Sequence, residues 1–95
     1  MPAYWIAHVE VTDADRYGEY LKRAGVAIPA HGGTFLARGG RHIQFEGNDR
    51  ERNVVVVFPS LEAAEACYRS PAYQEALTFA RDSAERDLVI VEGVA

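Results

Sequence analysis

The pattern of apolar and polar positions begins with a strand near the amino-terminal end. Residues 4–11 are rich in aromatic and β-branched types, and they alternate between two faces. One face is wholly apolar and consists of Trp5, Ala7, Val9 and Val11. We expect that face to pack under helices and the other face, with His8 and Glu10, to be mixed in character.

The spacing of apolar residues after this strand predicts a helix. Thr12 or Asp13 offers an N-cap, and apolar residues then recur at intervals of three and four. Gly25 and Pro29 predict a break in this helix and a short second turn after it. Residues 31–33, His-Gly-Gly, predict the end of the segment, because glycine accepts the positive φ found there.

The middle of the chain predicts strands joined by turns. The predicted strands are residues 34–38, 42–46 and 53–58. The last of them is apolar on both faces, which is typical of a central strand. Gly39 and Gly40 could make a tight hairpin or a bulge in one long strand. We favour the bulge, with the hairpin turn at residues 47–50.

Serines mark the next helices. Ser60 is a predicted N-cap, and Ser70 caps a further helix whose first position is Pro71. Residues 88–91 are the last predicted strand and are again apolar on both faces. Residues 1–95 are therefore expected to form one α+β domain of ferredoxin-like βαββαβ order, with an antiparallel sheet and the helices on one face.

The second face of such a sheet has no helix to cover it. Residues 54–58 and 88–91 nevertheless carry apolar side chains on that side, and a contiguous exposed apolar surface usually marks a partner. A domain of 95 residues also buries only roughly 60–65% of the surface that its unfolded chain exposes, so it gains from association. We therefore expect a homodimer that forms through this sheet face.

Composition limits the other partners. The net charge is −4, from 10 basic and 14 acidic residues, and no basic patch accumulates, which argues against binding to nucleic acid or to an anionic membrane. Cys67 is the single cysteine, so neither an internal disulfide nor a Cys-rich metal site is expected. No apolar run approaches the roughly 20 residues of a membrane helix and no cleavable signal is recognisable, so we expect a cytoplasmic protein.

Two histidines are candidate acid–base groups. His8 shares a strand face with Glu10, and the pair could shuttle a proton or bind a metal. The sequence places no third ligand, so no metal is expected, and the pair would also suit the polar rim of a dimer interface. His31 could act beside a pocket, or it could bind the free carbonyls at the end of a helix.

The segment Arg38-Gly39-Gly40 is the best candidate for binding a ligand. Arginine offers a planar fork to a carboxylate or phosphate, and adjacent glycines let a ligand approach the backbone closely. The alternative is a bulge beside an exposed arginine. Tyr20 and Tyr68 could line an aromatic pocket, or they could fill the seam between helices and sheet.

In order and spacing, segments along the whole chain resemble the domain-of-unknown-function family numbered 1330. They are residues 4–13, Tyr17, Tyr20, His31-Gly32-Gly33, residues 35–40, Glu46-Gly47, residues 52–55, Phe58-Pro59-Ser60, Cys67-Tyr68, residues 70–74 and Val91-Glu92-Gly93. The resemblance implies a dimeric α+β barrel fold and no particular activity. Its wider superfamily includes cofactor-independent monooxygenases, isomerases, dehydratases and haem proteins, a range too broad to indicate the chemistry.

Three functions are compatible with these features. In the first, each subunit of a homodimer binds a small organic molecule, which could be an anion, between sheet and helices. The ligand-binding residues would then be Arg38, Tyr20, Tyr68, Gly39 and Gly40. In the second, the protein is a cofactor-independent oxidoreductase or isomerase in which His8 or His31 is the acid or base and Arg38 holds an anion. In the third, it is a structural or regulatory dimer without a ligand. No cofactor is expected in any of the three.

Overall fold

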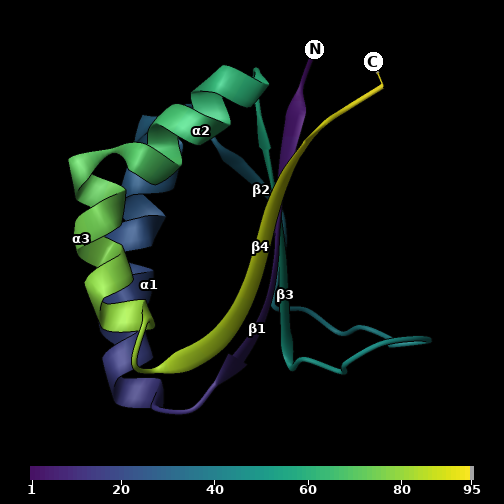
Figure 1. Ribbon diagram of the computed structural model, residues 1–95, viewed down its shortest axis with the longest axis vertical. Helices are drawn as coiled ribbons and strands as arrows, with labels where there is room; N and C mark the ends of the chain where they lie inside the picture. The colour runs from purple at the N-terminus through teal and green to yellow at the C-terminus, as the bar shows by residue number, and fades with distance from the viewer. Residues whose placement is uncertain (95) are drawn as a thin grey trace.

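The computed structural model describes residues 1–94 and contains one four-stranded antiparallel sheet with helices on one face (Figure 1). The elements in chain order are β1 (Ala3–Val11), α1 (Ala14–Ala30), β2 (Thr34–Arg38), β3 (Arg52–Phe58), α2 (Leu61–Arg69), α3 (Pro71–Ala80) and β4 (Ala84–Glu92). The strand order is β2-β3-β1-β4, with every neighbouring pair antiparallel. The ferredoxin-like class predicted from the sequence is confirmed.

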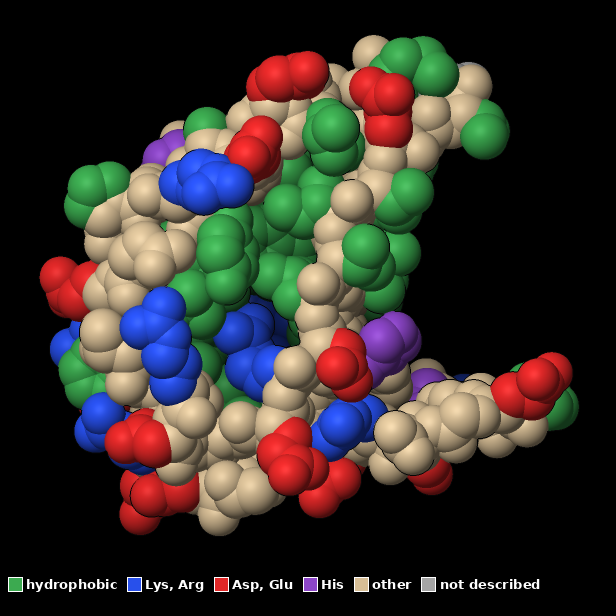
Figure 2. All heavy atoms as spheres, in the orientation of Figure 1, with side chains coloured by type: hydrophobic (Ala, Val, Ile, Leu, Met, Phe, Trp, Pro, Cys, Tyr) green, Lys and Arg blue, Asp and Glu red, His purple; other side chains and the backbone are tan. Residues whose placement is uncertain are grey.

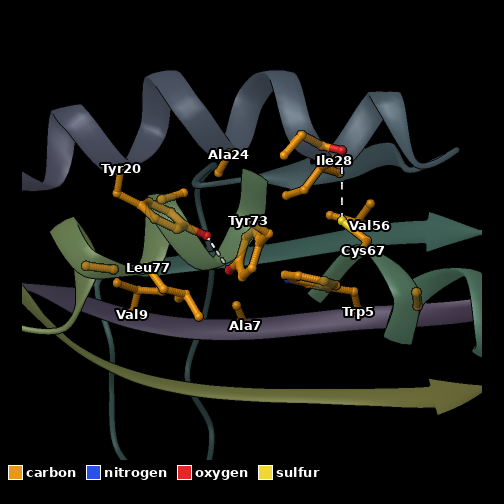
Figure 3. Packing of buried hydrophobic residues seen from close by; sticks show 14 of the residues in the cluster. Trp5, Ala7, Val9, Tyr20, Ala24, Ile28, Val56, Cys67, Tyr73 and Leu77 are labelled. Atoms are coloured by element: carbon orange, nitrogen blue, oxygen red, sulfur yellow. Dashed lines mark hydrogen bonds between the residues drawn. The ribbon is translucent and has the colours of Figure 1, made fainter. Parts of the chain in front are cut away.

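The face of the sheet that carries Trp5 is covered by the helices, as the alternation in β1 predicts. We call it the covered face. Trp5 pairs across the strands with Val56 and Ile90. Its ring packs against those of Phe58, Tyr68 and Tyr73, with centroid distances of 5.7, 5.9 and 5.0 Å. Figure 3 shows the rings of Trp5 and Tyr73 side by side. These aromatic contacts join the sheet to α2 and α3.

The first helix runs without interruption from Ala14 to Ala30, so the predicted break within it was wrong. Asp13 is the N-cap, and its carboxylate accepts a hydrogen bond from the backbone N–H of Arg16 at 3.1 Å. A helical glycine such as Gly25 costs only about 1 kcal/mol relative to alanine. Burial of the neighbouring apolar residues outweighs that cost, and Pro29 lies so near the end that few hydrogen bonds are lost.

The segment between β2 and β3 departs most from the prediction. Residues 42–46 form no strand, and residues 39–51 are a loop, here called the arm, which projects on the side away from the helices (Figure 1). The predicted turn at residues 47–50 therefore joins no strands. Ile43 and Phe45 are 78% and 87% exposed. Their alternation resembles that of a strand, but no neighbouring strand is there to pair with them.

The bulge occurs earlier than predicted. The register between β2 and β3 shifts between Phe35 and Ala37, so Leu36 is the extra residue. Gly39 neither continues a long strand nor starts a tight hairpin. Its N–H donates to the carbonyl of Asn53 at 2.9 Å, and its positive φ of +73° then turns the chain out of the sheet.

The opposite side of the sheet, here called the open face, has an apolar half and a polar half. Cross-strand pairing forms two apolar rows across β3, β1 and β4, which are Val57-Tyr4-Val91 and Val55-Ile6-Val89. The next row is Asn53-His8-Asp87, which is polar. Val89 and Val91 are 54% and 47% exposed. Among residues 1–94, no helix covers this face (Figure 1).

Candidate functional site

A cavity lies between the covered face and α1. β1 contributes Trp5, Ala7 and Val9 to its wall, and α1 contributes mainly tyrosine and aliphatic side chains. Its empty space is about 390 Å³, part of it continuous with solvent, but only about 30 Å³ is open to the centre of a water molecule. That is room for roughly one or two waters. An organic ligand would therefore require side chains at the mouth to move.

Three arginines from three strands reach the cavity, namely Arg38 of β2, Arg52 of β3 and Arg86 of β4. Arg52 and Arg86 both pair with Val9, from opposite sides of β1, and Arg38 pairs with Val54. All three therefore belong to the covered face. Among residues 1–94 the ion pairs involve other basic residues, so none of these guanidinium groups has a carboxylate partner there.

Arg86 is held by tyrosines. Its Nη2 donates to the hydroxyls of Tyr20 and Tyr73 at 2.9 and 3.2 Å. The two hydroxyls are 2.7 Å apart and hydrogen-bonded to each other (Figure 3). The guanidinium also lies 4.7 Å from the centroid of the Tyr20 ring, a cation–π contact. Burial raises the pKa of Tyr20 and of Tyr73, so both hydroxyls stay protonated at neutral pH. Among residues 1–94, the acceptors that bind Arg86 are therefore all neutral.

Arg52 and Arg38 are accommodated by glycines. A Cβ on Gly39 would lie 2.6 Å from Nη1 of Arg52, so the absence of a side chain makes room for that guanidinium. A Cβ on Gly25 would lie 3.3 Å from Nη2 of Arg38. Arg38 is exposed and lies 4.1 Å from the centroid of Phe35, which places it at the mouth of the cavity.

A shallow groove opens beside the edge strand β4. It is lined by residues of α2, α3 and β4, among them Tyr68, Leu77 and Arg86. Figure 2 shows this side of the molecule, where hydrophobic side chains surround a hollow that contains basic groups. Because Arg86 lines both spaces, its guanidinium lies between the groove and the cavity.

The structure brings some of the sequence candidates together and separates others. Arg38 and Tyr20 line the cavity, and Gly39 lies against Arg52. Gly40 is exposed, with open space around it. Tyr68 packs on Trp5 and Tyr73 and belongs to the groove beside β4 instead of the cavity.

Neither histidine candidate lines the cavity. Nδ1 of His31 donates to the carbonyl of Ala27 at 2.8 Å, which satisfies a free carbonyl at the end of α1. His8 lies on the open face, where its Nδ1 is 2.6 Å from Oδ1 of Asn53. Across residues 1–94, no three His, Cys, Asp or Glu side chains are placed to hold a metal ion, and no helix is long and apolar enough to span a membrane.

Sequence reasoning missed Arg52 and Arg86 because each precedes the strand that was predicted. Extending the alternation two residues towards the N-terminus from Val54 and from Leu88 would have placed both arginines on the covered face. The signal was present, but a charged residue at an inward position argues against continuing a strand.

The fold and the sheet order define a ferredoxin-like α+β protein. The chain belongs to the family described as domain of unknown function (DUF1330), whose model matches residues 2–94. No curated protein matches the chain.

Solved structures with the same fold share little sequence with this chain. A protein of unknown function from Rhodopseudomonas palustris, RPA0582, is 19% identical with a TM-score of 0.79, over 99% of this chain and 83% of that one. A dimeric ferredoxin-like protein of unknown function from Jannaschia sp. CCS1 is 15% identical with a TM-score of 0.75, over 98% and 100%. SnoaB, a cofactor-independent oxygenase from Streptomyces nogalater, is 12% identical with a TM-score of 0.66, over 99% and 94%.

Proposed function

We propose that the protein is a homodimer in which each subunit binds a small organic acid in the cavity between the covered face and α1. The observation that carries this proposal is the convergence of Arg38, Arg52 and Arg86 on one mostly apolar cavity without a carboxylate partner among residues 1–94. Apolar walls with a few convergent polar groups are the usual make-up of a small-molecule site.

The homodimer is supported by the open face. Its two apolar rows form a continuous apolar surface that no part of residues 1–94 covers. Two solved structures of the same fold are described as dimeric. A second copy of this face is the simplest partner, because two identical apolar surfaces related by a two-fold axis can bury each other. The cytoplasmic location expected from the sequence stays a prediction.

Calorimetry with a panel of small carboxylic acids tests ligand binding. Arg38→Ala should weaken the acids that bind by roughly 10- to 150-fold, the equivalent of about 1.5–3 kcal/mol for a hydrogen bond to a charged group. Arg41→Ala is the matched control, because Arg41 lies in the exposed arm and does not line the cavity. Equal affinity of the two variants, or no binding of any acid to a protein shown by native mass spectrometry to be free of ligand, would contradict the proposal.

A second candidate is the cofactor-independent oxidation of a bound acid by O₂. It is favoured by the N–H groups of Arg86 and the hydroxyls beside them, which suit the stabilisation of a developing oxyanion. The fold shared with a cofactor-independent oxygenase also favours it. Measurement of O₂ consumption with an oxygen electrode tests this second candidate. Acid-dependent O₂ consumption that Tyr73→Phe slows would support the enzyme, whereas binding without consumption would leave a binding protein.

A further inference from the structure

Arg52 and Arg86, here called the inner arginine pair, are less exposed than Arg38 at the mouth. Because both are opposite Val9 on the two neighbours of β1, their Cα atoms are about 10 Å apart. The Nε atom of each is buried and has no hydrogen-bond acceptor among residues 1–94. Two positive charges thus reach one cavity, and no side chain within that range balances them.

Arginine cannot relieve this situation by losing its proton. A cation in a site of low dielectric costs free energy unless it is paired, and two cations in one site also repel each other. The tyrosine hydroxyls give Arg86 neutral acceptors, and within residues 1–94 the guanidinium of Arg52 makes no hydrogen bond at all. An oxyanion would accept hydrogen bonds from the free Nε groups and neutralise part of the charge.

We infer that the inner arginine pair binds one acidic group of the ligand and that Arg38 binds a second, so that the ligand is an organic dianion of the dicarboxylate type. The inference rests on the proposed function, because it names the ligand class of the same cavity. Arg38 reaches the cavity from β2, two strands away from β1. Apolar side chains, including Leu21, Ala24 and Val54, line the space and suit a hydrocarbon body.

The test compares acids that differ only in a second carboxylate. Adipate is compared with hexanoate, and terephthalate with benzoate, by calorimetry on the whole protein. For at least one pair, the diacid should bind the unmodified protein at least tenfold more tightly than its monoacid. Arg52→Met should reduce this preference to less than threefold, and Arg41→Met, in the exposed arm, should keep it. Arg52 is chosen because the rest of the described chain makes no hydrogen bond to its guanidinium.

Arg86→Lys is a second variant that keeps the charge and removes the planar fork. It should also lower the preference for the diacid, and it guards against a folding defect in Arg52→Met. If the monoacids bind as tightly as the diacids, or if both inner variants keep a tenfold preference, the inference is wrong while the proposed function stands. If none of the four acids binds the unmodified protein, the inference is wrong, and the larger panel of carboxylic acids decides whether the proposed function stands.

Discussion

On β1, residues that are neighbours in the sequence face opposite environments. Trp5, Ala7 and Val9 on the covered face are at most 2% exposed. Tyr4 and Ile6 on the open face remain partly exposed, although their strand neighbours are valines. The covered face is filled by side chains of the same subunit, whereas the open face has nothing from its own subunit to pack against.

Each face also departs from what an isolated subunit needs. The covered face carries three arginines where apolar side chains are expected. The open face carries the two apolar rows where polar side chains are expected. Unpaired charge and exposed apolar surface both raise the free energy of a lone subunit. On the function proposed above, an anion would balance the charge on the covered face, and a second copy of the chain would bury the apolar rows of the open face.

The covered face should respond most strongly to truncation. Trp5→Ala should lower the free energy of unfolding by about 3–5 kcal/mol, because it removes the ring that contacts Phe58, Tyr68 and Tyr73. Urea unfolding followed by circular dichroism measures this, since Trp5 is the chain's only tryptophan. Phe45→Ala, in the exposed arm, is the control. A loss below 1 kcal/mol for Trp5→Ala would mean that the aromatic cluster does not hold the helices to the sheet.

The open face should respond through association instead of folding. Val55→Lys places a charge in one of the two apolar rows, and we expect the proposed dimer to weaken by about 2–4 kcal/mol, roughly 30- to 1000-fold in dissociation constant. Light scattering across a dilution series measures the change. Val26→Lys is a matched control, because Val26 is 72% exposed on α1. A monomeric unmodified protein at micromolar concentration, or an unchanged dimer in Val55→Lys, would disprove the assignment of this face.

A third prediction concerns Cys67, which is buried on α2 between the helices and the covered face. Burial raises the pKa of its thiol to about 11, and its Sγ lies 3.9 Å from the carbonyl of Ala27. At pH 8 only roughly one thiol in a thousand is ionised in the folded protein, so a disulfide reagent should react with it only after unfolding. An immediate stoichiometric reaction would show that the helices separate readily from the sheet.

The same shift in pKa predicts a dependence of stability on pH. The folded protein keeps the proton of Cys67 above the ordinary pKa of a thiol, so the stabilisation is complete below about pH 8.5 and is lost as the pH rises towards 11. The share of the loss that comes from the thiol should amount to roughly 3 kcal/mol at about pH 11. Cys67→Ala should lack this share and keep only the loss caused by other groups whose pKa burial raises, such as Tyr20 and Tyr73. Urea unfolding at pH 8, 9, 10 and 11 compares the two proteins.

Much of the fold could be predicted because the signals are local. The wholly apolar face of residues 4–11 identified the covered side of β1, and Ser60 and Ser70 marked the starts of two helices through their capping hydroxyls. Element order then selected the ferredoxin-like topology. Of the candidate site, Arg38 was identified by its residue type and the glycines that follow it, and Tyr20 by its residue type; both line the cavity.

What local pattern could not predict depends on contacts between distant parts of the chain. Residues 42–46 alternate as a strand does, yet a strand exists only where a neighbour pairs with it, and none does. His31 and His8 looked suitable as catalytic groups, and only the folded chain shows that they lie at a helix end and on the open face.

The sequence by itself determined the order of the elements, the caps of the helices and the apolar face of the first strand. All three depend on local signals, which are alternation, helical spacing and single capping residues. The tertiary structure alone decided that Arg52 and Arg86 lie opposite the same Val9. Strand pairing brings together residues that are far apart in the chain, and its register is set by the whole sheet. The positive charge of the cavity therefore depends on the strand register, and no single segment of the sequence determines that register.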